Sequence, residues 1–207
     1  MTSVNVPEIP RTERLELPAS STVLIVVDMQ NDFAHPDGAL YGEDSTRIVP
    51  VIQGLLEKAR AAGVRVVFTQ DWHGDNDPEF EIWGEHARAN TWGAEIVEGL
   101  EPEEDETHVR KLRYDAFYGT SLAHLLNLWG IKHTVIVGTV ANICVLHTAG
   151  SAALRYLDVV VPEDAVAALT PFDKESALRQ VTFLYRGEVT KADGVTFTRD
   201  EFTRDEA

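Results

Sequence analysis

The run VLIVV, from Val23 to Val27, is followed at once by Asp28. An uninterrupted apolar run rich in β-branched residues indicates a strand that is buried on both faces of a sheet. A carboxylate at the end of such a strand needs a partner or a function, because a buried unpaired charge is costly. A second run of this kind, TVIVG from Thr134 to Gly138, leads within a few residues to Cys144.

Strand and helix patterns alternate on both sides of these runs, with the spacing of βαβ units. The expected strands are Val23–Asp28, Val64–Gln70, Thr107–Lys111, Thr134–Gly138, Val159–Pro162 and one near Gly187–Thr190. The expected helices are Ser45–Ala62, Leu122–Trp129, Ile143–Tyr156 and Asp173–Leu184. The sequence therefore predicts a single α/β domain with a mostly parallel sheet of about six strands and helices on both faces.

Two segments depart from this alternation. Residues 1–20 are expected to form an extended arm, which leaves residues 21–207 as the domain itself. The segment from about 71 to 106 is irregular and contains many Trp, His, Asp and Gly residues. Long irregular insertions in compact domains are usually functional, so this insertion is a candidate part of a site.

The composition and net charge of the chain argue against some classes of binding partner. The formal net charge is -16, from 34 acidic and 18 basic residues. This argues against nucleic acid and anionic membranes, since both require a basic surface. We see no signal peptide and no apolar run long enough to span a bilayer. The single cysteine fits a reducing compartment, so the expected location is the cytoplasm.

Asp28, Lys111 and Cys144 each follow a predicted strand, and α/β sheets bind ligands at the carboxyl ends of their strands. An acid, a cation and a thiol in one cleft suit nucleophilic hydrolysis. Each residue also has a plainer interpretation. Cys144 fits a buried structural thiol, and Lys111, between Arg110 and Arg113, fits a solvated basic residue.

Three segments in order resemble the isochorismatase-like cysteine hydrolases: VVDMQNDF (26–33), RKLRYDAFYGTSL (110–122) and GTVANICVLHTA (138–149). The resemblance extends from about Thr22 to Leu169 and implies the isochorismatase-like hydrolase fold. It implies that Asp28, Lys111 and Cys144 are the catalytic residues. It also implies a cis peptide bond at Thr139–Val140, with the N–H groups of Val140 and Cys144 forming an oxyanion hole.

The segment TQDWHGDNDPEFEIWGEH, from Thr69 to His86, offers metal ligands. Asp71 and His73 are two residues apart and would point to one side of an extended chain. A wet, polar surface loop is the alternative interpretation. The segment resembles the nicotinamidase metal motif, which implies Asp71, His73 and His86 as ligands of one divalent transition metal. Zinc is the expected ion, with iron or manganese as alternatives.

Some nicotinamidases have an added Glu or Ser ligand between the two histidines, so Glu79 and Glu81 are further candidate ligands. The same resemblance implies that Phe33 and Trp83 sandwich a flat substrate ring and that Tyr114 closes the pocket. Ordinary core packing is the alternative for Phe33 and Trp83. The other histidines, His35, His108, His124, His133 and His147, are interpreted as structural or surface residues, with His35 a candidate for the pocket mouth.

The resemblance implies hydrolysis of nicotinamide to nicotinate and ammonia through a cysteine thioester, in a homo-oligomer. One departure concerns the substrate: nicotinamidases often have Thr-Asp where this chain has Ala141-Asn142, so a charge is lost. Two alternatives stay open. One is that the chain acts on a carbamoyl or ureido compound, as other amidohydrolases of the family do. The other is that it is a non-catalytic small-molecule-binding homologue.

Overall fold

The structure, a computed structural model, describes residue 5 and residues 7–199. A six-stranded sheet has the order β4-β3-β2-β5-β6-β7, and each neighbouring pair of strands is parallel. Its strands are β2 (Thr22–Val27), β3 (Arg65–Asp71), β4 (Thr107–Lys111), β5 (His133–Gly138), β6 (Asp158–Pro162) and β7 (Glu188–Thr190). The predicted fold class is confirmed.

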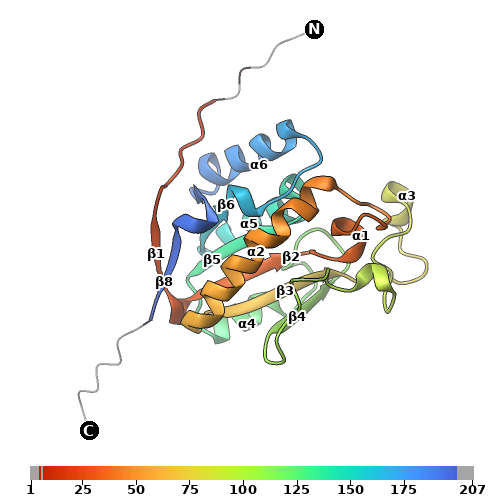
Figure 1. Ribbon diagram of the computed structural model, residues 1–207, viewed down its shortest axis with the longest axis horizontal. Coiled ribbons are helices and arrows are strands. Elements are labelled where there is room, and N and C mark those ends of the chain that lie inside the picture. Colours follow the sequence, from red (N-terminus) through yellow and green to blue (C-terminus); the bar gives the residue numbers. More distant parts are fainter. Residues whose placement is uncertain (1–4, 6, 200–207) are drawn as a thin grey trace.

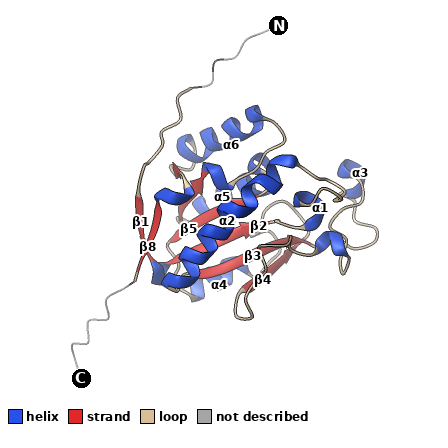
Figure 2. Cartoon of the chain, in the orientation of Figure 1, coloured by secondary structure: helices blue, strands red, loops and turns tan. Residues whose placement is uncertain are grey.

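Helices cover both faces of this sheet (Figure 2). Alternate residues of β2 point to opposite faces, as the pleat requires. Leu24 and Val26 pack with α2 (Glu43–Ala62) on one face. Val23, Ile25 and Val27 pack on the other face, where the covering helices are α4 (Leu122–Leu128), α5 (Leu146–Ala153) and α6 (Pro171–Phe183). Two short helices, α1 (Asn31–Ala34) and α3 (Phe80–Trp83), lie in the loops after β2 and β3.

All four predicted helices differ from the observed helices by at least one residue at one end, and α5 and α6 differ at both ends. Residues Ala141–Val145 form a π-helical turn before α5, and α5 ends at Ala153 rather than at Tyr156. Tyr156 has a positive φ of 61°, which ends any continuation of the helix. Helix α6 begins at Pro171, before the predicted start, because Thr170 caps it by accepting a hydrogen bond from the Asp173 N–H.

Two segments near the ends of the described part meet in a second, two-stranded sheet. Strand β1 (Leu15–Pro18) pairs in parallel with β8 (Val195–Thr198), and Figure 1 shows these segments side by side. The sequence predicted only an extended arm over residues 1–20 and no strand there. Residues 1–4 and 6 of that arm lie outside the described part, as do residues 200–207 of the expected domain. Within the described part, Leu17 is buried against the α2 face.

Among the described residues, no helix is both long enough and apolar enough to cross a membrane.

Candidate active site

The parallel sheet brings the predicted residues to one edge. Asp71 and Lys111 are the last residues of β3 and β4, and the register places them opposite each other. Asp28 follows β2, whose last residue pairs with Thr69 on one side and Gly138 on the other. The loop after β5 then delivers Cys144. The structure therefore places Asp28, Lys111 and Cys144 together at the ends of the strands, as the sequence predicted.

Lys111 is the centre of this group. Its Nζ lies 2.7 Å from Asp28 Oδ2, 2.5 Å from Asp71 Oδ1 and 3.6 Å from Cys144 Sγ. Only 2% of Lys111 is exposed, so it is not the solvated basic residue that its neighbours in sequence suggested. An oxygen of Asp28, an oxygen of Asp71 and Sγ of Cys144 lie within 4.8 Å of one another. The thiol, two carboxylates and an ammonium thus share one buried contact network.

Burial controls the protonation of this network. It raises the pKa of the Cys144 thiol well above its ordinary value, and the Lys111 ammonium opposes this only in part. Burial also raises the pKa of Asp28, against the lowering effect of Lys111. For Lys111, burial would lower the pKa, but the carboxylates of Asp28 and Asp71 raise it well above the ordinary value. The resting thiol is therefore neutral and needs a nearby base to become a nucleophile.

Asp28 is held in an uncommon backbone conformation. Its φ is 48°, in the left-handed region, which costs a non-glycine residue about 1–3 kcal/mol. Thr69 on β3 fixes it there: the Thr69 hydroxyl donates to Asp28 Oδ1 at 2.7 Å, and the Asp28 N–H donates to the Thr69 carbonyl at 3.2 Å. Thr69 was not among the predicted site residues, although a hydroxyl in a buried strand was the available signal.

The turn after β5 carries Cys144 toward the same place. Gly138 starts it with a φ of 112°, and a Cβ on Gly138 would collide with the Val27 backbone, so only glycine fits. The Thr139–Val140 peptide bond is cis, as the family resemblance implies. The structure places Cys144 inside the π-helical turn Ala141–Val145. The hydroxyl of Thr139 lies 3.0 Å from that of Ser45, at the start of α2, which ties this turn to the helix.

A second cluster lies beside the first. Candidate ligand atoms of Asp71, His73, Glu79 and His86 all lie within 4.8 Å of one another, and all four residues are buried. His86 Nδ1 lies 2.8 Å from the Gly84 carbonyl, which leaves Nε2 for a ligand. His73 Nε2 has no hydrogen-bond partner within the described part of the chain. The cluster thus offers two imidazoles and two carboxylates, and one imidazole has a buried nitrogen without a partner. This set of ligand atoms fits a divalent transition metal.

The structure separates the two additional candidate ligands. Glu79 belongs to the cluster and is buried. Glu81 is exposed on α3 and does not belong to it. Asp71 belongs to both clusters, because one of its oxygens contacts Lys111 and its carboxylate also faces His73 Nε2 at 3.9 Å.

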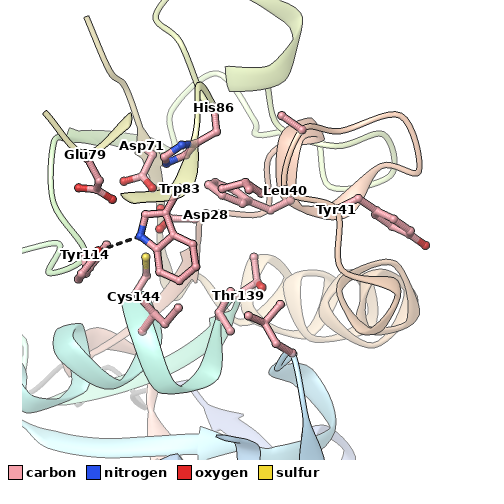
Figure 3. A pocket seen from close by; sticks show the side chains of 15 residues that line it. Asp28, Leu40, Tyr41, Asp71, Glu79, Trp83, His86, Tyr114, Thr139 and Cys144 are labelled. Atoms are coloured by element: carbon pink, nitrogen blue, oxygen red, sulfur yellow. Dashed lines mark hydrogen bonds between the residues drawn. The ribbon is translucent and has the colours of Figure 1, made fainter. Parts of the chain in front are cut away.

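Both clusters open into one cavity of about 320 Å³. Figure 3 shows Asp71, Glu79 and His86 grouped along one side of it, with Cys144 on another. Phe33, Trp83 and Tyr114 also line it, and the Trp83 indole N–H donates to the Tyr114 hydroxyl at 2.9 Å. Phe33 and Trp83 belong to neither hydrophobic core cluster of the described residues, although Phe33 is buried.

The rest of the wall was not anticipated from the sequence. It comes from Ala39, Leu40, Tyr41, Thr139, Ile143 and Leu169. Most of these residues lie in loops with no periodic pattern, so no sequence signal marked them. His35 is not part of the cavity wall and packs edge-on against Trp92 instead. The other four histidines given structural or surface roles also lie outside the wall.

With this geometry in place, comparison with known proteins decides the family. A model of the isochorismatase domain matches residues 22–193, which is most of the chain. The chain belongs to the isochorismatase family. The resemblance inferred from the three sequence segments is therefore confirmed.

Relatives within the isochorismatase family differ in their substrates. The chain is 30% identical over 198 residues to ureidoacrylate amidohydrolase of Serratia proteamaculans (strain 568), covering 83% of this chain and 80% of the relative. It is similar to the crystal structure of N-carbamoylsarcosine amidase from Thermoplasma acidophilum, with a TM-score of 0.77, 36% identity, and 84% and 97% of the two chains covered. It is also similar to the pyrazinamidase of Pyrococcus horikoshii in complex with zinc, with a TM-score of 0.74, 32% identity, and 86% and 99% covered.

Proposed function

We propose that this isochorismatase-family amidohydrolase is a metal-dependent nicotinamidase, which converts nicotinamide and water to nicotinate and ammonia. The observation that carries the proposal is one cavity that holds both clusters. Asp28 and Cys144 line it together with Asp71, Glu79 and His86. A cysteine amidase needs the first set of residues, whereas a pyridine ring nitrogen is recognised by the second.

The chemistry follows from the protonation state of the network. Asp28 takes the proton of the neutral Cys144 thiol, and the sulfur attacks the carboxamide carbon. The N–H groups of Val140 and Cys144 stabilise the negative oxygen of the tetrahedral intermediate. Asp28 returns the proton to the leaving nitrogen, the C–N bond breaks, and ammonia leaves a thioester. Asp28 then deprotonates a water, which cleaves the thioester to nicotinate and restores the thiol. Lys111 holds the Asp28 carboxylate in place throughout.

The candidate metal ligands have a separate task. Asp71, His73, Glu79 and His86 would hold the ion, and zinc is proposed, with iron and manganese as alternatives. The bound ion would supply a Lewis-acidic position for the pyridine nitrogen. Phe33, Trp83 and Tyr114 are proposed to contact the ring, because aromatic faces suit a flat heteroaromatic substrate.

Charge in the cavity favours an uncharged substrate. The positive charge of Lys111 balances the negative charge of Asp28, and a divalent ion would balance the charges of Asp71 and Glu79. The site with a bound ion would therefore have no net positive charge. Within the described part of the chain, no arginine or lysine lines the cavity wall. A substrate carboxylate would therefore find no arginine or lysine partner in the wall, which supports a neutral amide such as nicotinamide.

A second candidate is hydrolysis of a carbamoyl or ureido compound. The similarity to ureidoacrylate amidohydrolase and to N-carbamoylsarcosine amidase favours it. Both substrates named there carry a carboxylate, which the cavity wall does not match. A non-catalytic homologue is a weaker alternative, because it would have no need for a buried thiol in contact with Lys111.

The test is ammonia release by the purified chain from nicotinamide, pyrazinamide, benzamide, ureidoacrylate and N-carbamoylsarcosine, with and without a chelator. We expect turnover of nicotinamide and pyrazinamide that the chelator abolishes. Benzamide has nearly the same shape as nicotinamide without the ring nitrogen, so it should react slower by orders of magnitude. Equal kcat/KM for benzamide and nicotinamide would refute anchoring of the nitrogen by metal. Activity confined to the ureido compounds would favour the second candidate.

The expected homo-oligomer stays a prediction, which light scattering of the purified chain tests.

A further inference from the structure

Asp77 approaches the metal cluster from behind His73, although it is not one of the four candidate ligands. Its Oδ2 lies 3.1 Å from His73 Nδ1, and the side chains of Asp77 and His73 are 6% and 0% exposed. The approach is oblique, so neither ring nitrogen of His73 has a well-aligned hydrogen bond within the described residues. Nε2, on the opposite side of the ring, faces Asp71 at 3.9 Å.

Asp77 is itself held from several sides. Arg113, two residues beyond β4, places Nη1 at 3.0 and 3.1 Å from the two Asp77 oxygens. The same Nη1 lies 3.7 Å from Glu79 Oε2, and the Glu79 N–H donates to Asp77 Oδ1 at 2.9 Å. Asp77 thus accepts hydrogen bonds from Arg113 and from the Glu79 N–H, and the oxygen that faces His73 is an acceptor as well. Its useful partner on His73 is a protonated Nδ1.

This arrangement determines which nitrogen of His73 is free. A carboxylate beside Nδ1 favours the tautomer in which Nδ1 carries the proton, and Nε2 is then left as a lone-pair donor. Histidines that bind metals commonly donate their other N–H to a carboxylate, which fixes the orientation of the ring and makes it a stronger ligand. The buried, unpartnered Nε2 of His73 is the group that such a carboxylate would direct toward an ion.

We propose that Asp77, held by Arg113, is a positioning residue of the metal site: it orients His73 so that Nε2 binds the ion, and it anchors the start of the turn that carries Glu79. This inference rests on the proposed metal site and goes beyond it, because neither Asp77 nor Arg113 is a candidate ligand. Arg113 thereby joins the metal-binding segment to β4, whose last residue is Lys111.

The test measures metal affinity without substrate. The full chain is stripped of metal and titrated with Zn²⁺ in competition with a chromophoric chelator at fixed pH. Asp77→Ala should weaken Zn²⁺ binding by about 10- to 100-fold, the usual effect of removing a partner of a metal-binding histidine. Asp77→Asn should lose less, because its amide oxygen can still accept from Nδ1–H.

The matched control is Asp75→Asn. Asp75 lies in the same loop, but its side chain is 75% exposed and, among the described residues, forms an ion pair only with Arg88 at 2.9 Å, so Zn²⁺ affinity should not change. Co²⁺ in place of Zn²⁺ gives a second signature. Its visible absorption should shift in Asp77→Ala and stay unchanged in Asp75→Asn, which a general loss of stability would not produce.

If Asp77→Ala does not fold, as judged by circular dichroism, then Asp77→Asn and Arg113→Met carry the test. Wild-type affinity and Co²⁺ spectrum in both of these variants, or in Asp77→Ala, would overturn the inference. This test does not depend on the proposed function. Tight Zn²⁺ binding that depends on Asp77 supports the inference even if nicotinamide is not hydrolysed. A wild-type chain that binds no Zn²⁺ would overturn both.

Discussion

Thr69→Val changes one hydroxyl to a methyl group at the base of the proposed active site. Thr69 is fully buried in β3, and its hydroxyl donates to Asp28 Oδ1 at 2.7 Å. Valine has nearly the same shape and favours strands, so the backbone and the sheet should be unaffected. The substitution therefore removes the hydrogen bond to the Asp28 carboxylate, together with a longer one, at 3.3 Å, that the hydroxyl accepts from the Asp28 N–H.

The expected magnitude depends on the charge of the acceptor. A hydrogen bond to an ionised group contributes about 1.5–3 kcal/mol to stability, against about 0.5–1.5 kcal/mol for a neutral pair. Asp28 keeps its ion pair with Lys111, so we expect a loss of about 2 kcal/mol near neutral pH. Activity should fall as well, because the carboxylate that accepts the thiol proton is no longer fixed on one side.

Thr134→Val is the matched control. Thr134 is equally buried in the neighbouring part of the sheet, on β5, but its hydroxyl donates to the backbone carbonyl of Asp158 at 2.9 Å. Its acceptor is neutral and far from the cavity wall. The same chemical change should then cost about 0.5–1.5 kcal/mol and leave kcat unchanged.

Urea unfolding at several pH values is the assay, with m-values compared to confirm that only stability has changed. The Thr69 bond stabilises the charged form of Asp28, so its contribution is present above the pKa of Asp28 and is lost as pH falls through it. Burial raises that pKa above the ordinary value, so the loss should begin at a higher pH than for an exposed aspartate. A Thr69→Val deficit no larger than that of Thr134→Val, with wild-type kcat, would refute this reasoning.

Three further predictions concern the proposed roles. Cys144→Ala should fold normally and lose turnover by several orders of magnitude, and retention of more than roughly a tenth of wild-type kcat would exclude a covalent mechanism. Asp28→Asn should abolish kcat in a steady-state assay with little change in substrate affinity measured by calorimetry; weaker binding with an unchanged kcat would contradict its role as acid and base. Elemental analysis should find about one metal ion per chain, and the His73→Ala, His86→Ala double variant should lose it; stoichiometric metal in that variant would place the site elsewhere.

Much of the architecture was predictable because its signals are local. The uninterrupted apolar runs at Val23–Val27 and Thr134–Gly138 have few structural solutions other than central parallel strands. The meeting of Asp28, Lys111 and Cys144 followed from the same inference, since parallel strands end at one edge of a sheet. The pairing of β1 with β8 was not predictable, because each strand has four residues and the partners lie at opposite ends of the chain.

The ligands of the candidate metal cluster could not all be predicted from local sequence patterns. Glu79 and Glu81 have the same chemistry, and the sequence alone did not choose between them. In an extended chain they would point to one side, but the chain turns into the short helix α3 at Phe80. Residues two apart on a helix differ by about 200° in direction, so Glu79 faces the cluster and Glu81 faces solvent. That choice depends on a single helical turn, which sequence patterns locate poorly.

Asp71 links the two clusters, and the register of the sheet makes the link. It pairs with Lys111 across β3 and β4, so one carboxylate contacts the ammonium that holds Asp28 and also belongs to the candidate ligand set. A slip of one residue between these strands would turn Asp71 or Lys111 to the opposite face of the sheet. Both clusters would then be lost together. The thiol network and the metal cluster are thus two results of one strand pairing, which explains how residues from loops far apart in sequence share a single cavity.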